Sequence, residues 1–193
     1  SLLKVKTFHD AEAVVVAHEY QHYVTDMVSG ISFGSSSEIL VGDIIHEGYS
    51  DYLGASYVSD LNDVDATLVG EYALQACSPL QREVGTLSVF DNAVSYSSPH
   101  RPGLSWASAF WQLREELGMQ AADLLALKSQ FFISTSPGFF DSVEAVVQAD
   151  RALNNGVNES RIRRLFYDDV KWMGSLSGAF KDKDKGVFEV GLK

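Results

Sequence analysis

Apolar residues recur every three or four positions over most of this chain, which is the period of an α-helix with one buried face. The first such stretch runs from about residue 9 to 29, where Gly30 ends it, and the second covers about 42–59. Five further helices are predicted over residues 66–77, 103–117, 121–132, 139–153 and 159–173. Residues 78–102 carry several Gly and Pro and are predicted to be irregular. The pattern therefore predicts a mainly α protein.

Length and composition narrow the class of protein further. The 193 residues suffice for one domain with a hydrophobic core, assigned to residues 1–174, followed by a charged linker or tail over 175–193 that can hold a short strand. The formal net charge of −11 argues against nucleic acid or an anionic membrane surface as a partner. The apolar runs are too short for membrane insertion, and the first residues do not resemble a signal peptide.

A candidate metal site lies in the first predicted helix, in the sequence His18-Glu19-Tyr20-Gln21-His22. Residues four apart lie one turn apart on the same helix face, so the two imidazoles can bind one Zn²⁺ ion. Glu19 can then reach a water molecule on that metal. The alternative is a pair of histidines that only pack or face water.

A catalytic zinc ion needs a third protein ligand as well as one open position. The second predicted helix offers Glu47 and Asp51, again four apart. One carboxylate can bind the metal, while the other accepts the free N–H of a ligand histidine. His46 competes with Glu47 but lies about 100° away around the helix, so both are not expected to bind and Glu47 is favoured. For either carboxylate alone, a solvated acidic helix face is the alternative.

The segments AHEYQHYVTDMVSG and IHEGYSDYLGA together resemble the thermolysin-like metallopeptidases and their fungalysin relatives. Later segments resemble the loop histidine and the closing helices of the C-terminal lobe in that family, among them SPHRPGLSWASAFWQLREELG and ESRIRRLFYDDVKWMG. The resemblance covers about residues 8–174. It implies the helical C-terminal lobe of a zincin, with the β-rich N-terminal lobe, whose edge strand binds the substrate backbone, absent from this chain.

The resemblance also implies roles for individual residues. They comprise three zinc ligands (His18, His22 and Glu47), a general base (Glu19), a hydrogen-bond partner of His18 (Asp51), an oxyanion donor (His100) and a residue of the substrate pocket (Val15). The implied reaction is hydrolysis of internal peptide bonds by a zinc-bound water that Glu19 activates. The implied partners are a peptide or protein substrate and an upstream lobe or propeptide of the same protein. The implied location is secreted, cell-surface or periplasmic.

One residue departs from the family pattern, and several residue roles and functions stay open. Phe33 stands where thermolysin has a tyrosine that helps to polarise the carbonyl. Arg82 and Asp91 are candidates for the substrate-binding arginine and for the partner of His100. A calcium site is less favoured than a solvated acidic turn at Asp60, Asn62, Asp63 and Asp65.

Two other classes of function remain: an inactive, peptidase-derived zinc-binding domain with a structural or interaction role, and a helical interaction module without metal.

Overall fold

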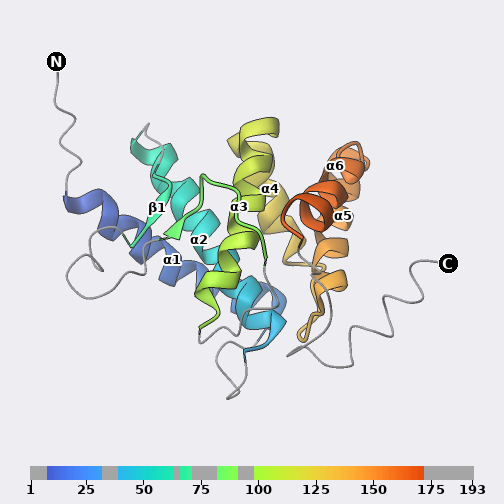
Figure 1. The fold of residues 1–193 in the computed structure, drawn as a ribbon, viewed down its shortest axis with the longest axis horizontal. Coiled ribbons are helices and arrows are strands. Elements are labelled where there is room, and N and C mark those ends of the chain that lie inside the picture. The colour runs from blue at the N-terminus through green and yellow to red at the C-terminus, as the bar shows by residue number, and fades with distance from the viewer. Residues whose placement is uncertain (1–7, 32–38, 63–65, 71–81, 91–97, 172–193) are drawn as a thin grey trace.

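A computed structural model of the protein describes residues 8–31, 39–62, 66–70, 82–90 and 98–171, with side chains from Ala13 onward except that of Asn62. In these parts the chain is mainly α-helical (Figure 1), and the predicted fold class is confirmed. The helices are α1 (Phe8–Ser29), α2 (Val41–Asn62), α3 (His100–Leu117), α4 (Met119–Ser129), α5 (Phe139–Asn154) and α6 (Glu159–Arg164), which continues into a π-helical turn, η1 (Leu165–Asp169). None of them is long and apolar enough to cross a membrane.

The predicted helix over residues 66–77 is wrong at its start. Leu68–Val69 forms a short strand, β1, which pairs antiparallel with β2 (Arg82–Glu83). The N–H of Val84 donates to the carbonyl oxygen of Thr67 at 2.9 Å and extends the pairing. Pairing with a distant segment overrides a weak local preference for helix. Residues 71–77 and the predicted tail lie outside the described part of the chain.

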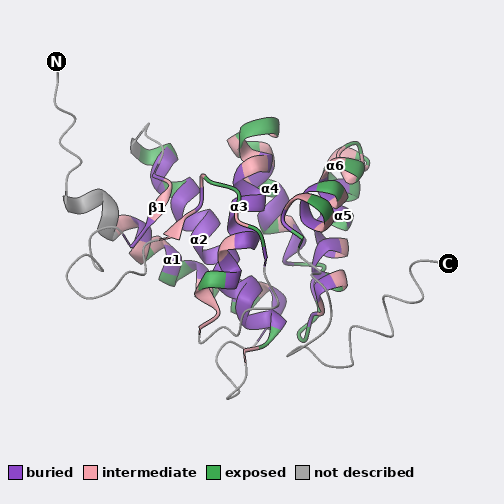
Figure 2. Ribbon diagram, in the orientation of Figure 1, coloured by how far each residue is buried: buried purple, intermediate pink, exposed green. Residues whose placement is uncertain are grey.

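Helix α2 lies at the centre of the packing, between α1 and α3 (Figure 1). Between residues 41 and 59, every α2 residue except Tyr57 is buried (Figure 2). The surrounding helices and connecting segments therefore enclose most of α2. Polar side chains on such a helix need partners inside the protein, because they have no access to water.

Glycines occupy the points where the neighbouring helices approach α2 most closely. A Cβ atom on Gly54 would lie 3.0 Å from the backbone nitrogen of His18 in α1. A Cβ on Gly48 would lie 2.6 Å from the Cβ of Trp106 in α3, and one on Gly103 would lie 2.9 Å from the Cβ of Glu47. These positions leave no room for a side chain. They bring the start of α3 and the His18 turn of α1 against the same stretch of α2.

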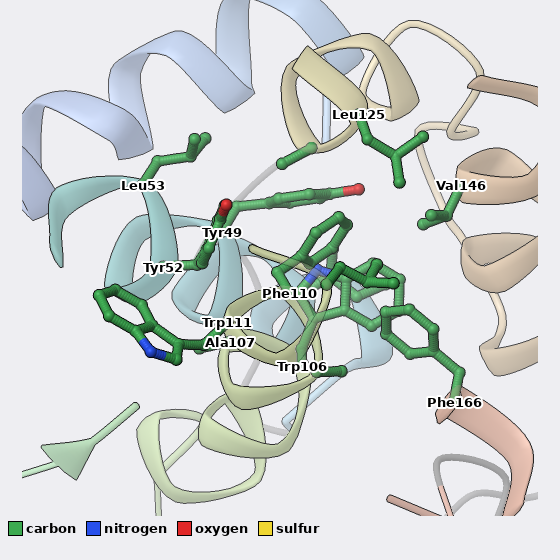
Figure 3. Close-up of a cluster of buried hydrophobic side chains, with 14 of the residues drawn as sticks. Tyr49, Tyr52, Leu53, Trp106, Ala107, Phe110, Trp111, Leu125, Val146 and Phe166 are labelled. Atoms are coloured by element: carbon green, nitrogen blue, oxygen red, sulfur yellow. The ribbon is translucent and has the colours of Figure 1, made fainter. Parts of the chain in front are cut away.

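A cluster of buried aromatic residues anchors α2 to the C-terminal helices (Figure 3). The Tyr49 ring packs edge-on against Trp106, with centroids 5.5 Å apart. The Tyr49 hydroxyl is hydrogen-bonded to the hydroxyl of Ser129 at 2.6 Å, and the Tyr52 hydroxyl donates to Asp123 at 2.7 Å. Both partners belong to α4. Two hydrogen bonds and aromatic packing therefore fix the rotation of α2 about its own axis.

Candidate metal centre

Three predicted ligand residues come together where α1 packs on α2. The Nε2 atoms of His18 and His22 lie 3.1 Å apart. One oxygen of Glu47 lies 3.3 Å from the His18 Nε2, and the other lies 3.7 Å from the His22 Nε2. Within the described parts of the chain, no other group of three or more His, Cys, Asp or Glu side chains is close enough to share a metal ion.

The spacing and chemistry of these atoms fit a zinc ion. Four ligands at about 2.1 Å from a tetrahedral zinc lie about 3.4 Å from one another, and the three observed separations bracket that value. Two imidazoles and one carboxylate form a donor set that suits Zn²⁺. His18 and Glu47 are only 4% and 1% exposed, whereas His22 is partly exposed. The group is therefore reachable from one side, as a catalytic metal requires.

Asp51 lies beside His18 and outside the group of ligand atoms. Its Oδ1 is 2.8 Å from the Nδ1 of His18, the ring nitrogen that faces away from Glu47. Asp51 also accepts two hydrogen bonds from Arg82, at 2.6 Å from Nε and 2.7 Å from Nη2. The position of Asp51 is the one expected from the sequence, and its role in metal binding stays a prediction. The sequence does not predict the Arg82–Asp51 ion pair, since it offers Arg82 only as a candidate for the substrate-binding arginine.

The electrostatics of the group favour a positive charge beside the Glu47 carboxylate. Burial alone would lower the pKa of His18, but hydrogen bonds to Asp51 and Glu47 raise it to about 9. Burial would likewise raise the pKa of Glu47, but contacts with His100 and His18 lower it to about 2. Burial and the charge of His18 lower the pKa of His22 to about 4. In the metal-free protein, a proton on His18 thus supplies positive charge that a divalent cation can replace.

His100 contacts the same group, and Glu19 follows His18 directly in the sequence. His100 is the first residue of α3, its Nδ1 contacts the carboxylate of Glu47, and its side chain is 36% exposed. Pro102 falls in the first turn of α3, where a missing N–H costs nothing. Glu19 is exposed on α1 next to His18, and Val15 is partly buried one turn earlier. The roles of these three predicted residues in catalysis stay predictions.

His46 contacts the opposite side of His22 from the ligand group. The Nδ1 atoms of the two rings are 2.6 Å apart, and the rings stack with centroids 4.9 Å apart and planes 25° apart. The hydroxyl of Ser50 lies 3.1 Å from the same nitrogen of His22. His46 is thus not one of the three grouped ligand residues, which favours Glu47 over the competing ligand. The sequence contains one signal for the shared contact with His22. His46 and Ser50 are four apart on α2 and therefore lie on the same face of that helix.

Several candidate residues predicted from the sequence lie in the segments between the described parts of the chain. Phe33 and Asp91 lie outside the described residues, as do Asp63 and Asp65 of the less favoured calcium site. Asp60 is exposed near the end of α2.

A helical domain that presents two histidines from an H-E-x-x-H helix and a glutamate from the next helix has the architecture of a zinc-dependent metallopeptidase. A family model described as fungalysin metallopeptidase (M36) matches residues 4–130, well over half of the chain, and the chain belongs to this family. The predicted family resemblance is confirmed.

Curated relatives of the chain are named as extracellular metalloproteinases. The chain is 25% identical over 189 positions to extracellular metalloproteinase 2 of Arthroderma gypseum, covering 81% of this chain and 30% of the relative. It is 25% identical over 186 positions to extracellular metalloproteinase mep of Aspergillus fumigatus, covering 80% of this chain and 29% of that protein. The chain thus spans about 30% of the length of the curated relatives it matches. No solved structure matches significantly.

Proposed function

We propose that this chain is the zinc-binding part of a secreted metalloendopeptidase, which hydrolyses internal peptide bonds of peptide or protein substrates. The observation that carries the proposal is the grouping of His18, His22 and Glu47. Glu19 is exposed and follows His18 directly on α1. Membership of the fungalysin family supports the reaction class, and the names of the extracellular relatives support secretion.

Each residue of the site has a distinct chemical task in this proposal. Zinc held by the three ligands would polarise the scissile carbonyl and make water more acidic. Glu19 takes a proton from the attacking water, whose oxygen bonds to the carbonyl carbon, and delivers that proton to the leaving amine as the C–N bond breaks. His100 donates a hydrogen bond to the oxyanion from Nε2, because its Nδ1 faces Glu47. One such donor is typically worth about 3–4 kcal/mol.

Asp51 and Arg82 position His18. A carboxylate at the Nδ1 of His18 keeps the proton on that nitrogen and leaves Nε2 with a lone pair for the metal. The two hydrogen bonds from Arg82 hold the Asp51 carboxylate in one orientation. In this proposal, Arg82 therefore acts on the metal site through Asp51.

We propose further polypeptide of the same protein as the partner of α1. Val16, Tyr20, Tyr23 and Met27 are 60–68% exposed and follow one another at helical spacing, so they form an apolar stripe along α1. An exposed stripe of this kind is typical of a surface that another element covers. The relatives are about three times as long as the matched segment, so they contain chain to cover it. The stripe flanks Glu19, which places a covering element next to the proposed reaction centre.

A Glu19→Gln variant tests the proposed reaction. Gln has almost the same shape but cannot take up the proton, so we expect the full-length protein to lose at least about 100-fold in hydrolysis of casein or a quenched peptide. Its zinc content should equal that of the wild type, because Glu19 is not among the ligands. Zinc binding without any Glu19-dependent hydrolysis would contradict the peptidase proposal and favour a zinc-binding structural or interaction domain.

A further inference from the structure

We propose that His46 is a positioning residue that orients His22 for metal binding, by accepting a hydrogen bond from the Nδ1–H of His22. This inference rests on the zinc site proposed above. It gives His46 a task within the site, although His46 is not one of the three grouped ligand residues.

The two ring nitrogens that face each other determine where the hydrogens lie. Two imidazole nitrogens 2.6 Å apart need a hydrogen between them, since two lone pairs at that distance would repel. The Nε2 of His22 belongs to the ligand group, 3.1 Å from the Nε2 of His18. A neutral histidine that offers the Nε2 lone pair to a metal carries its hydrogen on Nδ1. His22 is therefore the donor, His46 is the acceptor at Nδ1, and the hydrogen of the His46 ring lies on Nε2.

The surroundings hold this arrangement in place. His46 is 1% exposed and stacks on His22, so the acceptor cannot swing away into solvent. Ser50 is fully buried one turn further along α2, and its hydroxyl lies 3.1 Å from the same Nδ1 of His22. Because Glu47 follows His46 directly, the same turn of α2 provides one proposed ligand and orients another.

The two ligand histidines thus differ in what holds them. His18 faces the Asp51 carboxylate, which also increases the basicity of the ring. His22 faces a neutral imidazole, whose main effect is to fix the tautomer and the direction of the ring. Loss of such a partner typically costs about 10- to 100-fold in metal affinity.

A pair of variants separates this role from simple packing. In His46→Asn, the side-chain oxygen takes the place of the Nδ1 acceptor, whereas His46→Leu has similar bulk and no acceptor. We expect the Leu variant to bind zinc about 10- to 100-fold more weakly in competition with a chelator and to change the visible spectrum of the Co²⁺ form. The Asn variant should stay within about threefold of wild type and keep its spectrum. Equal zinc affinity in the wild-type and Leu proteins, or equal losses in both variants, would overturn the inference.

A measurement on the wild-type protein avoids any dependence on how the variants fold. Nitrogen-15 NMR of the zinc-loaded protein should show His22 with its hydrogen on Nδ1 and His46 with its hydrogen on Nε2. A hydrogen on Nδ1 of His46 would overturn the inference while leaving the zinc site intact. A wild-type protein that takes up no stoichiometric zinc would instead overturn the proposed function itself.

Discussion

Each of the two candidate ligand histidines presents one ring nitrogen to the ligand group and the other to a side chain of α2. His18 faces Asp51, and His22 faces His46 and Ser50. A histidine held at both nitrogens has a defined tautomer and a defined ring direction before a metal arrives. Since Asp51 and His46 both come from α2, the proposed metal site depends on the position of that one helix.

Replacement of Asp51 tests the role of the His18 partner. We expect Asp51→Ala to weaken zinc binding by about 10- to 100-fold without abolishing it, because the three ligands remain. The variant should also lose about 3 kcal/mol of stability in urea denaturation, since the largely buried Arg82 loses its partner. Complete loss of zinc would show instead that Asp51 binds the metal directly.

A surface ion pair provides the matched control for Asp51→Ala. Glu116 pairs with Arg161 where both side chains are about a third exposed. We expect Glu116→Gln to change stability by less than about 1 kcal/mol and to leave zinc affinity unchanged. An equal effect of the two substitutions on zinc affinity would contradict a specific role for Asp51.

The residues that the sequence revealed are those related by helical spacing. His18 and His22, like Glu47 and Asp51, are four apart, so a local rule is enough to pair them. The same rule separated His46 from Glu47 around α2, but it cannot tell which side chain of another helix His46 meets. Arg82 is 31 residues from Asp51, and no local pattern links the two. Contacts between elements therefore account for what the sequence did not predict.

At the level of elements, close helix crossings set the spacing of the site. Because Gly54 has no side chain, the backbone of His18 can pack against it, and the Cβ of Glu47 packs against Gly103 in the same way. Short approaches of this kind transmit any change in helix position directly to the ligands, because a packed interior yields little. We infer that these glycines are needed for the geometry of the metal group as well as for packing.

Gly48→Ala tests whether the steric clash at the close crossing of α2 and α3 outweighs the higher helix propensity of alanine. Alanine in a helix is favoured over glycine by about 1 kcal/mol. The new Cβ, however, would lie 2.6 Å from the Cβ of Trp106 and 2.8 Å from the carbonyl oxygen of Gly103, and neither atom can rotate away. We expect a net loss of about 1–3 kcal/mol in urea denaturation. Tyr57→Ala, at an exposed position of the same helix, should change stability by less than about 0.5 kcal/mol. A Gly48→Ala protein more stable than wild type would contradict the close crossing.

The error in the predicted helix over residues 66–77 also has a consequence for the site. Strand β2 pairs with β1 and contains Arg82, the residue that holds Asp51. A helix prediction gives no account of the position of Arg82, because the pairing joins two strands separated by residues 70–81 and does not follow helical spacing. The six other predicted helices are present, with ends that differ by a few residues from those expected.

At the scale of the whole molecule, the exposed stripe on α1 bears on activity. A substrate carbonyl must be held against the metal and the attacking water, and misplacement by about 1 Å can cost 100-fold in rate. Among the described residues, the only sheet is the pair of β1 and β2, and its strands of two residues each are short for binding an extended peptide. We therefore expect this chain alone to bind zinc but to hydrolyse peptides poorly.

The comparison that tests this expectation uses the chain alone and the proposed longer protein that would contain it. The full-length protein should show a kcat/KM at least about 100-fold higher on a quenched peptide, with the same zinc content per chain. Each protein needs its own Glu19→Gln variant as the control for background hydrolysis. Equal Glu19-dependent activity in the two proteins would contradict a role for additional polypeptide next to α1.

The metal content of the purified protein tests the central claim most directly. Mass spectrometry after dialysis against zinc-containing buffer should find about one zinc per chain in the wild type. We expect background zinc in a folded His18→Ala, His22→Ala double variant, and about one zinc in His100→Ala, the control for loss of a histidine that is not a ligand. Stoichiometric zinc in the double variant, or none in the wild type, would contradict a zinc site formed by His18, His22 and Glu47.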